Sequence, residues 1–117
     1  MDYMERYAFW KNAPGMPQKV VNELEAIAND PEELKSRFGS DLQFGTAGMR
    51  GIMGAGSNRL NRYTVRRAAQ GMAAWLNTTN LPKRAAIGYD SRHNSRLFAE
   101  VCAVAFAEAG IEAWIYD

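Results

Sequence analysis

The fold is decided by residues 85–116, which read AAIGYDSRHNSRLFAEVCAVAFAEAGIEAWIY. The short apolar run at 85–89 favours a strand, and a polar turn follows it. The alanine-rich stretch 95–109 favours a helix that ends at Gly110, and residues 111–116 favour a second strand. A strand, a helix and a strand within roughly 30 residues form a βαβ unit, so we expect the two strands to be parallel.

The polar turn DSRHNS lies where the first strand ends. Ligands of parallel sheets bind outside the carboxyl ends of the strands, so this turn is a candidate binding loop. It offers the carboxylate of Asp90, the guanidinium of Arg92 and the imidazole of His93. The same residue types are common in ordinary turns and helix caps, and that interpretation stays open. Nothing singles out a serine nucleophile, so no Ser/His/Asp triad is indicated.

A glycine-rich stretch precedes this unit, and residues 44–51 read FGTAGMRG. Residues 42–57 contain five glycines and no helical period, so we expect short extended pieces around a loop. The stretch is not a Walker loop, because no Gly-Lys-Ser/Thr follows it. The G-x-G at Gly54 and Gly56 is not a dinucleotide fingerprint, because Arg59 stands where the third glycine would be. Glycines nonetheless let the backbone approach a ligand, and Arg50 can donate two parallel hydrogen bonds to a phosphate. An anion site and a plain tight turn both remain possible.

Helices are expected before and after the glycine-rich stretch. Pro17 is a suitable first residue for a helix whose apolar side chains recur through Ile27. Asp30 caps a second, short helix, and Gly39 ends it. We interpret these N-terminal helices as scaffold without chemistry. A further helix runs from a cap at Asn61 to about residue 77, and its expected buried stripe consists of Val65, Ala68, Ala69, Met72, Ala73 and Leu76.

The composition excludes several classes of protein. The 117 residues are 47% hydrophobic and 23% charged with a net charge of +1, so neither nucleic acid nor a membrane is an expected partner. The single Cys102 excludes an intrachain disulfide and fits a cytoplasmic location, and with the single His93 it cannot form a zinc cluster. The N-terminus is acidic where a signal peptide would be basic.

The charges are unevenly distributed along the chain. Residues 1–41 contain eight acidic and five basic residues, and residues 90–117 contain five acidic and two basic ones. The 48 residues between them, 42–89, contain seven basic residues and no acidic one. This block suggests an anionic ligand nearby. In the alternative interpretation, arginines such as Arg66 and Arg67 are solvated and pair with the acidic flanks.

The two motifs together resemble a known family. FGTAGMRGIMGAGSNRLNRYTVRRAAQG (44–71), followed by AIGYDSRHNS (86–95), looks like the start of an α-D-phosphohexomutase, in the phosphoglucomutase/phosphomannomutase branch that includes phosphopentomutases. The resemblance implies an α/β fold: a three-layer α/β/α domain whose mixed sheet contains the parallel βαβ unit. We therefore divide the chain into a helical extension (1–41) and the first part of domain I (42–117), which would be incomplete.

The resemblance also implies an activity. Members of the family interconvert a sugar 1-phosphate and a sugar 6-phosphate, or a 5-phosphate for pentoses, through a phosphoserine. Their Mg²⁺ lies in a loop that has no counterpart in these 117 residues, and a sugar bisphosphate serves as primer. We therefore expect an N-terminal fragment that is inactive alone, holds no metal and self-associates through its incomplete sheet. A sugar phosphate is the expected substrate, and which sugar stays open.

Site residues carry over from the family only where the motifs match. Arg50 corresponds to the active-site arginine that meets phosphate oxygens, so it is the expected catalytic residue. Thr46, Gly45 and Gly48 belong to the same motif and are expected to bind phosphate or substrate. Asp90 and Arg92 match the second loop and are also expected at the binding site, whereas His93 and Ser95 match without an assigned role.

Two alternatives to the mutase remain open at this point. The chain could be a small α/β module that binds phosphate or a partner without catalysis, complete as it stands. A purely structural dimerisation domain is a third interpretation. A phosphoserine-loop sequence soon after residue 117 would favour the mutase, and a stop codon there would favour the module.

Overall fold

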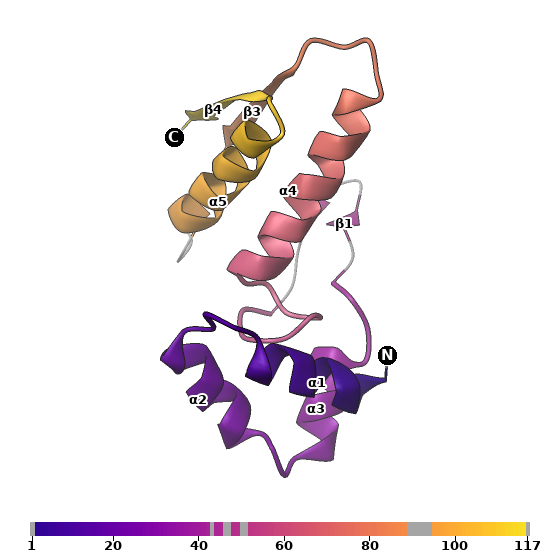
Figure 1. Cartoon of the computed structure of the whole chain (residues 1–117), viewed down its shortest axis with the longest axis vertical. Coiled ribbons are helices and arrows are strands. Elements are labelled where there is room, and N and C mark those ends of the chain that lie inside the picture. The colour runs from indigo at the N-terminus through magenta and orange to yellow at the C-terminus, as the bar shows by residue number, and fades with distance from the viewer. Residues whose placement is uncertain (1, 43, 46–47, 50–51, 89–94, 117) are drawn as a thin grey trace. The chain divides into compact units, whose positions relative to one another are not determined.

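A computed structural model describes residues 2–42, 44–45, 48–49, 52–88 and 95–116. The chain divides into two compact units, Met1–Asn61 and Arg62–Asp117, which are described separately here. The first unit contains helices α1–α3 and the strands β1 and β2 (Figure 1). The second contains α4, β3, α5 and β4. The predicted sites at Thr46, Arg50 and residues 90–93 lie outside the described residues.

The helices of the first unit begin and end at the expected kinds of residue. They are α1 (Tyr3–Asn12), α2 (Gln18–Ala26) and α3 (Pro31–Phe38). The Asp30 carboxylate accepts a hydrogen bond from the Glu33 amide at 3.2 Å, and Gly39 ends α3 as predicted. Pro17 immediately precedes α2 instead of being its first residue. The caps of α3 are therefore confirmed, and the start of α2 is displaced by one position.

The three helices enclose one small core. Its buried residues are Tyr7, Leu24, Ile27, Leu34, Phe38 and Ala55. The Tyr7 ring meets Phe38 edge-on with centroids 5.8 Å apart, and its hydroxyl donates to the Leu24 carbonyl at 3.0 Å. Ala55 comes from the glycine-rich part of the chain, so that segment contributes to the helical core.

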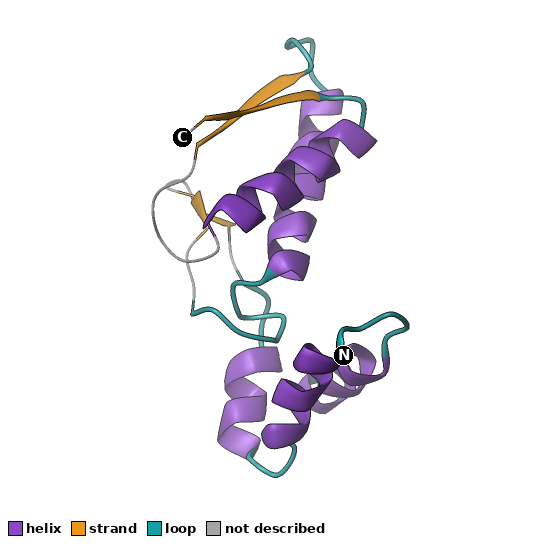
Figure 2. Cartoon of the chain, turned by 90° about the vertical axis from the view of Figure 1, so that its left-hand side faces the viewer, coloured by secondary structure: helices purple, strands orange, loops and turns teal. Residues whose placement is uncertain are grey.

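The second unit is the predicted βαβ unit preceded by a helix. Its elements are α4 (Arg62–Asn77), β3 (Arg84–Gly88), α5 (Ser95–Glu108) and β4 (Glu112–Tyr116). The strands are parallel, with Arg84 opposite Glu112 and Gly88 opposite Tyr116. Figure 2 shows the two long strands side by side. The parallel pairing and the order of the elements are confirmed.

The core of the second unit lies between the helices and one face of the strands. Its buried residues are Ala69, Ala73, Leu76, Ala105, Phe106 and Ile111, against which Ala85, Ile87 and Ala113 of the strands pack. Most of the stripe predicted for α4 is therefore buried. Met72 is an exception at 41% exposed, so its placement in the stripe was wrong. Thr64, which the sequence did not indicate, is buried within the first turn of α4.

The other face of β3 and β4 is exposed. Side chains alternate along β4, so Trp114 and Tyr116 are 53% and 56% exposed while Ala113 and Ile115 are partly covered. In the described ranges, the antiparallel and the parallel strand pairs belong to separate two-stranded sheets, so a single mixed sheet is not observed. An α/β fold is confirmed, and its three-layer form remains a prediction.

Cys102 lies half-buried on α5 beside the core of the second unit. Burial raises the pKa of its thiol, because the apolar surroundings disfavour the charged thiolate. The thiol is therefore protonated at neutral pH and weakly reactive. Among the helices the structure describes, none combines the length and the apolar character that a membrane crossing requires.

Candidate functional site

The glycine-rich stretch forms a short antiparallel hairpin. Strand β1 (Phe44–Gly45) pairs with β2 (Gly48–Met49), and Gly45 lies opposite Gly48. Among the described residues, these two glycines are the one pair of predicted site residues that the structure brings together. Arg50 follows β2 directly in the sequence. The expected extended pieces around a loop are thus confirmed, and the roles of the glycines remain predictions.

The second predicted loop connects β3 to α5. Asp90, Arg92 and His93 lie outside the described residues, and Ser95 is the first residue of α5. The loop follows Gly88, which pairs with Tyr116 at the carboxyl ends of the two parallel strands. The two strands therefore end side by side as the βαβ pattern predicts, and the binding role of the residues that follow β3 stays a prediction.

Main-chain hydrogen bonds join the two ends of the glycine-rich loop. The Leu42 amide, just before the loop, donates to the Ser57 carbonyl at 2.8 Å. After the loop, the Leu60 amide donates to the Ile52 carbonyl at 2.8 Å, and the Gly54 amide donates to the Leu60 carbonyl at 3.2 Å. Residues 52–61, called here the 52–61 segment, therefore fold back on themselves and hold both ends of the loop.

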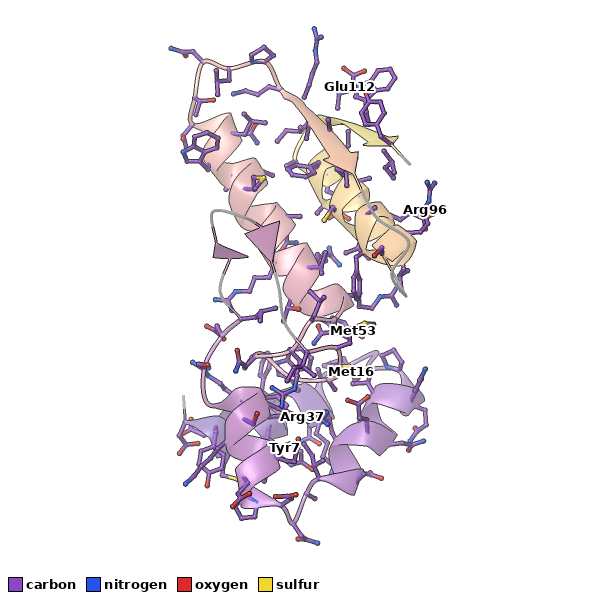
Figure 3. All side chains as sticks on the ribbon, turned by 180° about the vertical axis from the view of Figure 1, so that it is seen from behind. Tyr7, Met16, Arg37, Met53, Arg96 and Glu112 are labelled. Atoms are coloured by element: carbon purple, nitrogen blue, oxygen red, sulfur yellow. The ribbon has the colours of Figure 1, made fainter. Side chains whose placement is uncertain are left out.

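Two side chains from the N-terminal helices bind the main chain of Ala55. The Glu23 carboxylate on α2 accepts a hydrogen bond from the Ala55 amide at 2.7 Å. Arg37 on α3 donates to that same carboxylate at 2.6 Å and to the Ala55 carbonyl at 3.3 Å. Its Nε also donates to Glu33 at 2.9 Å. Figure 3 labels Arg37 on its helix. The sequence indicated none of these contacts, because the helices carry no recognisable motif.

Arg59 is a buried residue that binds α3 in the same unit. It is only 6% exposed, and its guanidinium donates to the Ser36 carbonyl at 3.1 Å and to the Ser36 hydroxyl at 2.7 Å. The Glu33 carboxylate lies 3.9 Å away. The Asn58 amide donates to the Arg37 carbonyl at 2.8 Å. Arg59 therefore anchors the 52–61 segment to the carboxyl end of α3.

Gly54 and Gly56 allow the 52–61 segment to lie close to the N-terminal helices. Gly56 has φ of +133°, and a Cβ at this position would lie 2.8 Å from both the Cβ and the carbonyl oxygen of Arg37. Gly54 has φ of +154°, and a Cβ there would lie 3.2 Å from the Glu23 carboxylate. The Gly-Ala-Gly sequence thus serves contact with the helices, which explains the G-x-G pattern without a nucleotide.

The charge of Glu23 is stabilised by this arrangement. Burial alone would raise the pKa of Glu23, but the hydrogen bond from the Ala55 amide and the adjacent Arg37 outweigh that effect. The pKa of Glu23 is therefore below the ordinary value of 4.5. The carboxylate is charged throughout the neutral range.

The lowered pKa of Glu23 predicts a dependence of stability on acidic pH. A group with a lower pKa in the folded state contributes its full stabilisation above the unfolded value of 4.5 and loses it as the pH falls through the folded value. We expect the urea midpoint of the first unit to decrease as the pH falls below 4.5, and to decrease less in Glu23→Gln. The exposed Glu25 on the same helix gives the matched control Glu25→Gln. Equal pH profiles in both variants would contradict this expectation.

Several residues of the basic block have local acceptors. Arg66 on α4 pairs with Glu108 at 3.2 Å, and the Arg84 guanidinium lies 3.9 Å from Glu112. The Lys83 ammonium donates to the carbonyls of Leu76 and Thr79 at 2.7 and 2.8 Å. The pairing of Arg66 supports the interpretation in which these arginines meet the acidic flanks. Local partners are thus described for Arg66, Arg84 and Lys83, and an anionic ligand near Arg50 stays a prediction.

Metal ligands do not gather in the described part of the chain. No group of three or more His, Cys, Asp or Glu side chains lies there in a position to hold an ion.

Comparison with known proteins identifies what the chain is similar to. The family model described as "Phosphoglucomutase/phosphomannomutase, alpha/beta/alpha domain I" matches residues 41–117. Phosphoglucomutases of Staphylococcus aureus strains USA300 and NCTC 8325 / PS 47 are each 40% identical over 85 residues, which cover 73% of this chain and 15% of those proteins. The enzyme of the bovine strain RF122 / ET3-1 matches over the same extent. No solved structure matches.

Proposed function

Because the chain belongs to the phosphoglucomutase/phosphomannomutase family through its domain I, we propose that it supplies part of the active site of a sugar-phosphate mutase. The family match over residues 41–117 is the observation that carries this proposal. The chain spans 15% of the length of its curated relatives, so the activity would belong to a longer protein.

The proposed reaction moves a phosphoryl group between two hydroxyls of one sugar. A serine outside this chain donates its phosphoryl group to the sugar phosphate, giving a bisphosphate, and the serine then recovers a phosphoryl group from the other position. Each transfer breaks one P–O bond and forms another. Mg²⁺ would be held by residues outside this chain and would neutralise phosphoryl charge, and a sugar bisphosphate would prime the serine. A cytoplasmic location is part of the same proposal.

Residues of this chain would position the phosphate. Arg50 would donate two parallel hydrogen bonds to phosphate oxygens and stabilise the charge that spreads during transfer. Gly45 and Gly48, which lie opposite each other without side chains, would leave their main chain accessible to the ligand beside Thr46. Asp90 and Arg92, after the carboxyl end of β3, would complete the substrate contacts.

The test is an assay of the full-length protein with glucose 1-phosphate, mannose 1-phosphate and ribose 1-phosphate, in the presence of Mg²⁺ and the matching bisphosphate. Turnover of one of them, with a phosphoserine detected by mass spectrometry, would support the mutase. Residues 1–117 alone should not turn over any of the three sugars. Phosphate binding without turnover in the full-length protein would favour the non-catalytic module.

We propose in addition that the isolated chain self-associates. Trp114 and Tyr116 form an exposed apolar face on β4, and the described part of the sheet contains two strands with a free edge on each side. Sedimentation of residues 1–117 at tens of micromolar (a concentration chosen for the test) should show species larger than a monomer. The double variant Trp114→Ser, Tyr116→Thr should shift them toward monomer. A wild-type chain that sediments as a monomer would contradict the proposal.

A further inference from the structure

We infer that Glu23 and Arg37 are positioning residues for the reaction proposed above, because they hold the 52–61 segment and through it both ends of the loop that contains Arg50. The catalytic part of this inference rests on the proposed function. The contacts that hold the segment stand independently of it. Both residues lie in the N-terminal helices, before the region that the family model matches.

The first step is the fixation of Ala55. Its amide donates to Glu23, its carbonyl accepts from Arg37, and its methyl group is buried in the core of the helices. Glu23 and Arg37 also bind each other, so each side chain is oriented by the other. A main-chain unit held at its donor, its acceptor and its side chain has little freedom to shift.

The second step is the connection from Ala55 to the loop. Ser57, two residues later, accepts the Leu42 amide, and its hydroxyl donates to the Ser40 carbonyl at 3.0 Å. On the other side, the Ile52 carbonyl accepts the Leu60 amide. The residues that flank 43–51 are therefore joined to the same segment, so a displacement of Ala55 would displace both ends of the loop.

The third step separates positioning from general stability. The helices pack through apolar side chains such as Tyr7, Leu24 and Phe38, and the Glu23 side chain is not part of that core. Removal of the Glu23 carboxylate should therefore release the 52–61 segment while the helical core stays folded. A small displacement of a catalytic group lowers the rate of a positioned reaction even when the substrate still binds.

The experiment compares three variants of the full-length protein. Glu23→Ala removes both contacts, Glu23→Gln keeps an oxygen that can accept the Ala55 amide, and Glu25→Ala is the exposed control on the same helix. Hydrogen exchange by mass spectrometry is followed in peptides that cover 39–45 and 52–61. Steady-state kinetics give kcat and KM for the sugar phosphate that the wild type uses.

We expect exchange in both peptides to be about tenfold faster in Glu23→Ala, with peptides from α1 unchanged. We expect kcat to fall about tenfold with KM changed less than about twofold, partial recovery in Glu23→Gln, and wild-type behaviour in Glu25→Ala. Arg37→Met should reproduce the Glu23→Ala result, because it removes the other side chain that binds Ala55.

Two outcomes would overturn the inference while the proposed function stands. One is unchanged exchange in Glu23→Ala, and the other is faster exchange with normal kcat. A wild-type protein that turns over no sugar phosphate would overturn the proposed function and the catalytic part of the inference together. The exchange data would then still decide whether Glu23 holds the 52–61 segment.

Discussion

Replacement of Arg50 by alanine in the full-length protein is expected to lower kcat by about 10²–10³-fold, equivalent to about 3–4 kcal/mol of transition-state stabilisation. The reason is the loss of a charge-assisted contact that strengthens as negative charge spreads over the transferring phosphoryl group. Arg50→Lys should recover only part of the rate, because a single ammonium cannot reproduce two parallel hydrogen bonds. Steady-state kinetics and a thermal melt on the same preparations measure both effects.

Arg66→Ala provides the matched control for Arg50. Arg66 also belongs to the basic block, but it forms an exposed pair with Glu108. Its removal should leave kcat unchanged and shift stability by less than about 0.5 kcal/mol. If Arg50→Ala behaves like this control, Arg50 is a turn residue without a catalytic contact and the proposed role is wrong.

Replacement of Gly56 by alanine is expected to lower the free energy of unfolding of the first unit by about 2–4 kcal/mol. The alanine would have to adopt a φ of +133°, and its Cβ would approach the Arg37 carbonyl to 2.8 Å. That carbonyl belongs to the main chain of α3 and accepts the Asn58 amide, so it cannot move aside without loss of a second contact. Alanine at position 56 would therefore suffer both backbone strain and a steric clash with α3.

The measurement uses the fluorescence of Trp10, which packs edge-on against Phe38 with centroids 5.9 Å apart. Replacement of Trp75 and Trp114 by phenylalanine leaves Trp10 as the sole tryptophan of the chain. Gly15→Ala is the control, because Gly15 has φ of +77° but open space around its Cβ position. This control should cost about 1 kcal/mol. A loss in Gly56→Ala no greater than in Gly15→Ala would show that contact with α3 imposes no constraint.

Local signals account for what could be predicted of the fold. The Asp30 cap and the glycines that end helices act on their immediate neighbours, so their effects can be inferred from short stretches. The alternation of strand, helix and strand at 84–116 is equally local, and the parallel pairing follows from it. Met72 shows the limit of periodicity, because the stripe on α4 is narrower than its spacing suggested.

The contacts of the 52–61 segment could not be predicted in the same way. Glu23 and Ala55 are separated by 32 positions, and neither belongs to a periodic pattern that would pair them. Arg59 belongs to the basic block, for which the sequence leaves an anionic ligand and local pairing both open, and the structure shows that it binds Ser36 in the same unit. For the site itself, the glycine pairing is described, and the roles of Arg50, Asp90 and Arg92 rest on the family motifs.

The burial of Arg59 against Ser36 bears on how this protein can be divided and recombined. The family signature starts at residue 41, but the oxygen atoms that accept from the 52–61 segment belong to residues 23 and 36–40. A chimera joined at residue 41 would inherit the signature and separate the Arg59 guanidinium from Ser36. The family signature therefore begins inside the first compact unit, not at its start. A crossover placed before α1 would keep that unit and the signature together in the chimera.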